Sequence, residues 1–147
     1  MQETIEYIRK AFDLKSQKCY KQAIEMLYKA LEIETGNTEI LFQLGELYFL
    51  LNNFQRSMQY LEKVLQCNSE HVDALKLLQK IHTISCEKEM ALQTAEKIFN
   101  IQKTADNLVE LIKAASKTAD FEKIKEFEDS EIVNDKILYE IAKAYYD

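Results

Sequence analysis

The fold is decided by residues 38–71, which read TEILFQLGELYFLLNNFQRSMQYLEKVLQCNSEH. Apolar residues recur along this stretch at spacings of three and four, which is the period of an amphipathic α-helix. The pattern breaks at Asn52-Asn53, where two asparagines favour a turn and Asn53 can cap a helix that begins at Phe54. The stretch therefore predicts two short helices joined by a tight turn.

The same pattern recurs along the chain with a period of 34 residues. A fixed period of roughly 20–50 residues is the signature of stacked structural repeats. The helical pattern also breaks near Gln17 to Cys19 and at Cys86-Glu87, as it does at Asn52-Asn53. Equivalent positions in three successive units hold Tyr7, Leu41 and Leu75; Ala23, Ser57 and Ala91; Leu27, Leu61 and Ala95; and Ala30, Val64 and Ile98.

Within residues 38–71, the run Leu41-x2-Leu44-Gly45-x2-Tyr48, followed by Ser57, Leu61 and Val64, resembles the tetratricopeptide repeat pattern. The resemblance implies an all-α fold in a single domain, residues 1–147. The expected architecture is a right-handed α-solenoid of about four helix-turn-helix repeats and a terminal helix. The expected units are 4–37, 38–71, 72–104, a degenerate 105–134, and the terminal helix over 135–147.

The last two units depart from the pattern. The second helix expected from Phe121 decays into Glu126-Phe127-Glu128-Asp129-Ser130, which we interpret as a solvated helix end. The run Leu138-x2-Ile141-Ala142-x2-Tyr145 then restores the pattern of a first helix. Two interpretations fit this final helix: it caps the apolar end of the array, or it is the first helix of a further repeat in a longer protein.

Composition disfavours several classes of protein. The chain has a formal net charge of −6, and its 19 basic residues are interspersed with 25 acidic ones, which argues against a nucleic-acid partner. The absence of proline and the presence of only two glycines argue against sandwiches, barrels and α/β folds. The longest apolar run, Leu47 to Leu51, is far shorter than the roughly 18–20 residues that span a bilayer. We therefore expect no contact with a membrane.

No set of residues with catalytic or metal-binding spacing stands out. Cys19, Cys67 and Cys86 are widely spaced, without a CxxC pair, and neither His71 nor His82 lies at ligand spacing from them. We interpret the cysteines as reduced thiols of a cytoplasmic protein, with Cys67 in the core and the other two in turns. We also find no catalytic triad and no glycine-rich phosphate loop. The expected protein is not an enzyme and needs neither cofactor nor metal.

The resemblance implies that one face of each first helix lines a concave groove. That groove would be apolar and aromatic at its N-terminal end and charged further along, and aromatic anchors often dominate binding energy. The alternative is that the aromatic side chains only pack on the next helix, and that the lysines form a solvated face paired with Asp73 or Glu46. The predicted groove residues are Ile5, Ile8, Phe12, Phe42, Glu46, Phe49, Lys76 and Lys80.

These features predict a non-catalytic scaffold that binds a protein or peptide segment carrying apolar or aromatic anchors. Two alternatives stay open: a regulatory or targeting module of a longer enzyme such as a transferase, and self-association through the C-terminal helix around Tyr139, Tyr145 and Tyr146. Family members that grip the acidic tail of chaperones use lysine, asparagine and arginine at five groove positions, and this chain does not, which argues against such a partner. Those positions hold Ile8, Phe12, Gln43, Asp73 and Leu77.

Overall fold

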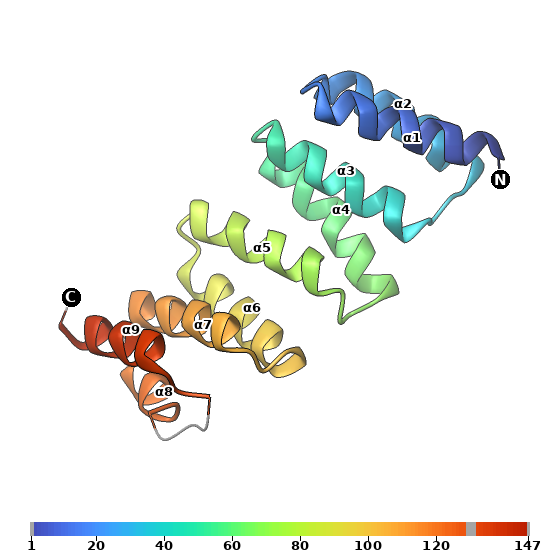
Figure 1. Ribbon diagram of the computed structural model, residues 1–147. Helices are drawn as coiled ribbons and strands as arrows, with labels where there is room; N and C mark the ends of the chain where they lie inside the picture. Colours follow the sequence, from blue (N-terminus) through green and yellow to red (C-terminus); the bar gives the residue numbers. More distant parts are fainter. Residues whose placement is uncertain (1, 129–131, 147) are drawn as a thin grey trace. The chain divides into compact units, whose positions relative to one another are not determined.

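The computed structural model describes residues 2–128 and 132–146 (Figure 1). Within these residues every regular element is a helix, which confirms the all-α prediction. The helices are α1 (Gln2–Ser16), α2 (Tyr20–Ile33), α3 (Thr38–Leu50), α4 (Phe54–Cys67), α5 (Val72–Ile84), α6 (Lys88–Ile101), α7 (Ala105–Thr118), α8 (Phe121–Lys125) and α9 (Asp135–Tyr146). None of them is long and apolar enough to cross a membrane.

The chain forms two compact units, Met1–Ala74 and Leu75–Asp147, and the boundary falls within α5. In the first unit, α1 packs against α2, α2 against α3, and α3 against α4. The helices meet along their apolar stripes, as expected for amphipathic helices that cannot bury those stripes alone. One cluster of buried side chains in this unit consists of Ala11, Ala23, Ile24, Leu27, Ala30, Ile40, Leu44, Leu47 and Tyr48.

Helices α3 and α4 approach each other closely at Gly45. A Cβ at this position would lie 3.0 Å from Leu61 Cδ2 and 3.2 Å from Leu61 Cγ, so a side chain here would press on Leu61. The small Ser57 on α4 also approaches closely, because its hydroxyl donates to the Gly45 carbonyl over 2.7 Å. Small residues at these two positions therefore allow the two helix backbones to approach each other.

The turn that follows the first helix of each pair has the same backbone geometry at four places. One residue is in the left-handed region, and the amide of the next residue donates to the carbonyl five residues earlier, as in a Schellman motif. The left-handed residues are Lys18 (φ 60°), Asn52 (φ 56°), Cys86 (φ 59°) and Ala119 (φ 57°). The corresponding hydrogen bonds run from Cys19 to Leu14 (2.8 Å), Asn53 to Tyr48 (2.9 Å), Glu87 to His82 (2.9 Å) and Asp120 to Ala115 (3.0 Å).

The helices that follow two of these turns carry side-chain caps, as predicted for Asn53. The Asn53 side chain accepts a hydrogen bond from the Arg56 amide over 3.2 Å at the start of α4. Asp120 accepts one from the Lys123 amide over 3.3 Å at the start of α8. Both caps satisfy amides that have no partner within the helix, and so they fix where each helix begins.

In the second unit, α7 is the central helix and packs against α6, α8 and α9. Lys123 on α8 forms an ion pair with Glu96 on α6, and Asp106 on α7 pairs with Lys136 on α9 over 2.8 Å. Asp129 and Ser130, where the fourth repeat was predicted to decay, lie outside the described residues. The buried core consists of Leu92, Ala95, Phe99, Leu108, Val109, Leu111, Ile112, Ala114, Ala115, Ile124, Ile137, Ile141 and Ala144.

The predicted location of Cys67 in the core is wrong. Cys67 is the last residue of α4 and is exposed, because the buried stripe of that helix runs through Ser57, Leu61 and Val64 and does not continue to it. Cys86 is exposed and Cys19 is half-buried, and all three cysteines are free thiols.

Three tyrosines and an arginine connect α2, α3 and α4. The Tyr28 hydroxyl hydrogen-bonds the hydroxyls of Tyr48 (2.8 Å) and Tyr60 (2.9 Å), and the Arg56 guanidinium donates to the Tyr48 hydroxyl over 3.0 Å. The rings of Tyr48 and Tyr60 are stacked, with centroids 5.6 Å apart. Burial raises the pKa of Tyr28 and the pKa of Tyr48 above the ordinary value of 10.0. The folded state therefore holds these two protons more tightly than the unfolded chain does.

The raised pKa values predict a loss of stability in alkali. The contribution of Tyr28 and Tyr48 is complete below pH 10 and is lost as the pH rises through their folded pKa values. Urea unfolding over a pH series should show the free energy of unfolding falling above pH 10, and falling less steeply in Tyr28→Phe. Tyr146→Phe is the control, because Tyr146 is 91% exposed. If the free energy of unfolding fell above pH 10 as steeply in Tyr28→Phe as in the wild type, the raised pKa of Tyr28 would not explain the loss of stability.

The left-handed turn residues predict a stabilising substitution. A residue with a Cβ is strained at positive φ, whereas glycine is not, so Lys18→Gly should raise the free energy of unfolding by about 0.5–1 kcal/mol. Lys10→Gly in the exposed middle of α1 is the matched control and should lower it by about 1 kcal/mol. Urea denaturation measures both free energies of unfolding. A lower value for Lys18→Gly than for the wild type would contradict the prediction.

Candidate partner-binding face

One face of α1 carries the exposed apolar side chains of Ile5 and Phe12, together with Ile8, which also packs against the core. Ile5, Ile8 and Phe12 follow one another at helical spacing and so share a face of the helix. Ile5 is 63% exposed and Phe12 is 45% exposed, while Ile8 is half-buried. The adjacent Ala11 is buried in the core, so α1 packs through a neighbouring stripe and leaves Phe12 exposed beside it.

The equivalent face of α3 carries Phe42, Glu46 and Phe49. Phe42 is half-buried, and its ring centroid lies 5.0 Å from that of His71, in the segment before α5. Phe49 is also half-buried, with its ring 5.7 Å from Phe54 at the start of α4. Both rings therefore have packing partners within the protein, which is what the alternative interpretation of these aromatics expected.

Lys15 joins the faces of the two helices. Its Nζ lies 2.7 Å from Glu46 Oε2 and donates to Gln43 Oε1 over 3.1 Å, and it sits 5.9 Å from the centroid of the Phe12 ring. The Gln43 amide in turn donates to Glu39 Oε1 over 2.9 Å. Because Lys15 contacts both Phe12 and Glu46, Phe12 of α1 lies near Glu46 of α3. We call this surface the α1–α3 face and define it by Ile5, Ile8, Phe12, Lys15, Phe42, Glu46 and Phe49.

The structure brings six of the eight predicted groove residues to the α1–α3 face. The other two, Lys76 and Lys80, lie one turn apart on α5, are exposed, and belong to the second unit. Glu46 pairs with Lys15. Lys15 lies on the same helical face as Phe12, and its pairing with Glu46 adds it to the predicted residues of this surface.

The two histidines have structural roles. The amide of Ala74 donates to His71 Nδ1 over 3.2 Å near the start of α5, and buried His82 contacts Glu87 Oε2 through its Nδ1 over 2.5 Å. Among the described residues, no group of three or more histidine, cysteine, aspartate or glutamate side chains could hold a metal ion. Each histidine instead stabilises the end of a helix or the turn that follows it.

Comparison with known proteins supports the helical-repeat interpretation. A family model described as tetratricopeptide repeat matches residues 14–83. No curated protein matches the chain in sequence.

Several solved structures have the same fold. A fragment of MamA from Desulfovibrio magneticus RS-1 is 17% identical, with a TM-score of 0.81 over 99% of this chain and 85% of that one. YrrB, described as a TPR protein with an unusual peptide-binding site, is 16% identical, with a TM-score of 0.76 over 97% and 76%. The first TPR of Spaghetti (RPAP3), bound to the HSP90 peptide SRMEEVD, is 18% identical, with a TM-score of 0.72 over 80% and 94%.

These likenesses at low identity show the fold, and the family model identifies the repeat. We conclude that residues 14–83 consist of tetratricopeptide repeats and that the chain as a whole has a tetratricopeptide-repeat fold.

Proposed function

We propose that the chain is a non-catalytic scaffold that binds a segment of a partner protein on the α1–α3 face. The observation that carries this proposal is the exposure of Ile5 (63%) and Phe12 (45%) on one side of α1. Apolar side chains that cluster on a surface are characteristic of interaction sites, and aromatic anchors supply much of the binding energy. Phe12 is the best-exposed aromatic side chain of the face and is therefore its proposed anchor.

The rest of the face would act as a preformed support. The half-buried rings of Phe42 and Phe49 are held by His71 and Phe54, so they present fixed apolar walls to a ligand. The ion pair between Lys15 and Glu46 holds α1 against α3. A surface already ordered before binding loses little conformational entropy when a partner segment docks.

The comparisons support a peptide-like ligand without naming it. The HSP90 peptide is a ligand of the Spaghetti domain, and a peptide-binding site is described for YrrB. This chain has Ile8 and Phe12 where the chaperone-binding members carry lysine and asparagine, so we propose a segment with apolar or aromatic anchors in place of an acidic chaperone tail.

Lys76 and Lys80 are proposed as a separate contact for acidic residues of the partner. We also propose a cytoplasmic location, which the three free thiols support.

A second candidate function is self-association through α9. Its inner side is buried through Ile137, Ile141 and Ala144, but Leu138 is 51% exposed and Tyr139 66% exposed. Light scattering over a concentration series tests this candidate, since a monomer mass that stays constant refutes it. A regulatory module of a longer enzyme is also compatible with a partner-binding α1–α3 face.

The proposed anchor predicts the result of a capture experiment. Immobilised wild-type chain and the variants Phe12→Ala and Ile33→Ala are incubated with lysate of the source cells, and bound proteins are identified by mass spectrometry. Ile33 on α2 is 44% exposed and is therefore matched to Phe12 in exposure but lies outside the face. A partner retained by wild type and Ile33→Ala but lost with Phe12→Ala is expected. Identical captures by all three chains would refute the proposal.

Two variants of the α1–α3 face, Phe12→Ala and Phe42→Ala, should differ in stability according to their packing. Phe12→Ala should change the free energy of unfolding by no more than about 0.5 kcal/mol, because the side chain is exposed. Phe42→Ala should cost more, about 1–3 kcal/mol, because it removes a half-buried ring from its contact with His71. Urea denaturation measures both. Equal losses would mean that Phe12 also serves mainly to hold the fold.

A further inference from the structure

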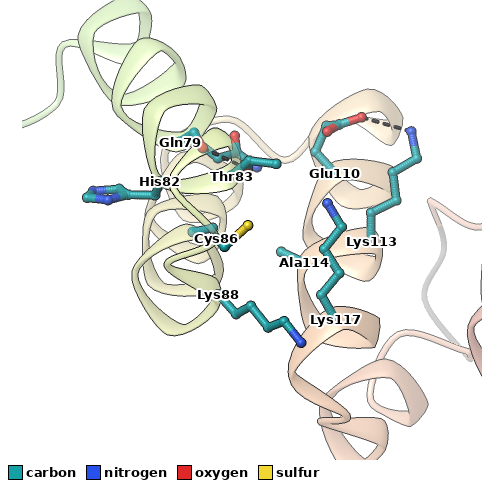
Figure 2. A pocket seen from close by; sticks show the side chains of 10 residues that line it. Gln79, His82, Thr83, Cys86, Lys88, Glu110, Lys113, Ala114 and Lys117 are labelled. Atoms are coloured by element: carbon teal, nitrogen blue, oxygen red, sulfur yellow. Dashed lines mark hydrogen bonds and ion pairs between the residues drawn. The ribbon is translucent and has the colours of Figure 1, made fainter. Parts of the chain in front are cut away.

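The second unit contains a pocket of about 350 Å³ that is lined by residues of α5, α6 and α7 and of the turn between α5 and α6 (Figure 2). Ala91 on α6 and Ala114 on α7 contribute small apolar surfaces to its lining. Pockets that hold small molecules measure roughly 300–1,000 Å³, so this one is at the small end of the range and suits one or two amino-acid side chains.

Positive charge predominates around this pocket. Lys88, Lys113 and Lys117 line it, against one carboxylate, that of Glu110. Figure 2 shows Lys88 and Lys117 reaching into the space between the α5–α6 turn and α7, whereas Lys113 runs along α7 and pairs with Glu110 over 3.0 Å. His82 also lines the pocket, but its Nδ1 is occupied by Glu87, so the lysines provide the charge that a ligand would meet.

The positive surface continues to the other side of α7. A second hollow, of about 300 Å³, shares Lys113 and Lys117 with the first and adds Lys143 and Glu140 of α9. The two hollows together are lined by four lysines and two glutamates, whereas the whole chain carries a net charge of −6. A local excess of one sign within a chain of the opposite sign favours a ligand of complementary charge.

We propose that this surface binds an acidic segment of another protein that lies across α7. An apolar side chain of the segment would occupy the pocket beside Ala91 and Ala114, and carboxylates on either side of it would contact Lys88, Lys113 and Lys117. The site lies wholly within the second unit and shares no residue with the α1–α3 face, so either proposal can fail without the other.

A second copy of the chain is a poorer occupant. Its own acidic run, Glu126-Phe127-Glu128, has the right alternation of acidic and apolar residues. However, the Phe127 ring packs edge-to-face on Phe99, with centroids 5.5 Å apart, and the residue is half-buried against the core. That side chain is therefore not free to enter the pocket of another copy, and a segment from a different protein is the occupant that we favour.

The test uses the full chain and a fluorescein-labelled peptide in which one leucine is flanked on each side by two glutamates. Fluorescence anisotropy at low salt should show saturable binding to the wild type. Lys113→Gln/Lys117→Gln should weaken binding about tenfold, because two lysine–carboxylate contacts are lost. The control Lys97→Gln/Lys103→Gln removes the same charge from exposed positions outside the pocket and should change affinity less than about twofold. Amide chemical shifts should move at Ala91 and Ala114.

Three results would overturn the proposal. The wild type could fail to bind the peptide saturably at low salt. The control variant could lose as much affinity as Lys113→Gln/Lys117→Gln, which would show non-specific attraction to the chain. A peptide with glutamine in place of glutamate could bind equally well, which would show that the carboxylates are not recognised. None of these results bears on the capture of a partner through Phe12.

Discussion

The contact between two helices of a pair is the constraint on which the rest of the structure depends. A single amphipathic helix of 13 to 15 residues, as α1 to α7 are, is marginal in water and gains its stability by burying an apolar stripe against a neighbour. In α3 and α4 that contact is so close that a Cβ at Gly45 would lie 3.0 Å from Leu61 Cδ2 and would press on that side chain. The recurring left-handed turn then sets the direction in which each second helix returns.

This constraint also determines where binding can occur. Side chains used for pair packing are buried, as Ala11 is, and cannot meet a partner. On α1 the side chains left over are Ile5 and Phe12, which lie on a face beside the buried stripe. In the second unit the leftover positions around α7 hold lysines, so the same architecture presents an apolar surface in one unit and a cationic one in the other.

Much of the fold could be predicted because its signals are local. The spacing of apolar residues predicts the helices, and the caps at Asn53 and Asp120 follow from residue types that accept hydrogen bonds from the first turn. The turns are less visible in residue type, because of the four left-handed positions only Asn52 holds a residue that favours this conformation. The break in the helical pattern locates the turn at Lys18, but neither Lys18 nor Ala119 is a residue type that predicts a left-handed backbone.

The sequence predicts which residues of the candidate site share a helical face. It does not predict how exposed each of these side chains is. Helical periodicity shows that Phe42 and Phe49 share a side of α3, but their partners His71 and Phe54 come from other segments. The same limit explains Cys67, whose exposure depends on where α4 ends relative to its buried stripe. Periodicity thus identifies which residues lie together, and tertiary packing decides which of them a partner can reach.

The most direct test of the central claim is site-specific photo-crosslinking in the source cells, with benzoylphenylalanine placed at position 12 in one chain and at position 33 in another. The account predicts a discrete crosslinked product from position 12 that is absent from position 33. Crosslinks of equal yield from both positions, or from position 33 alone, would contradict it, because the partner would then not be held at the α1–α3 face.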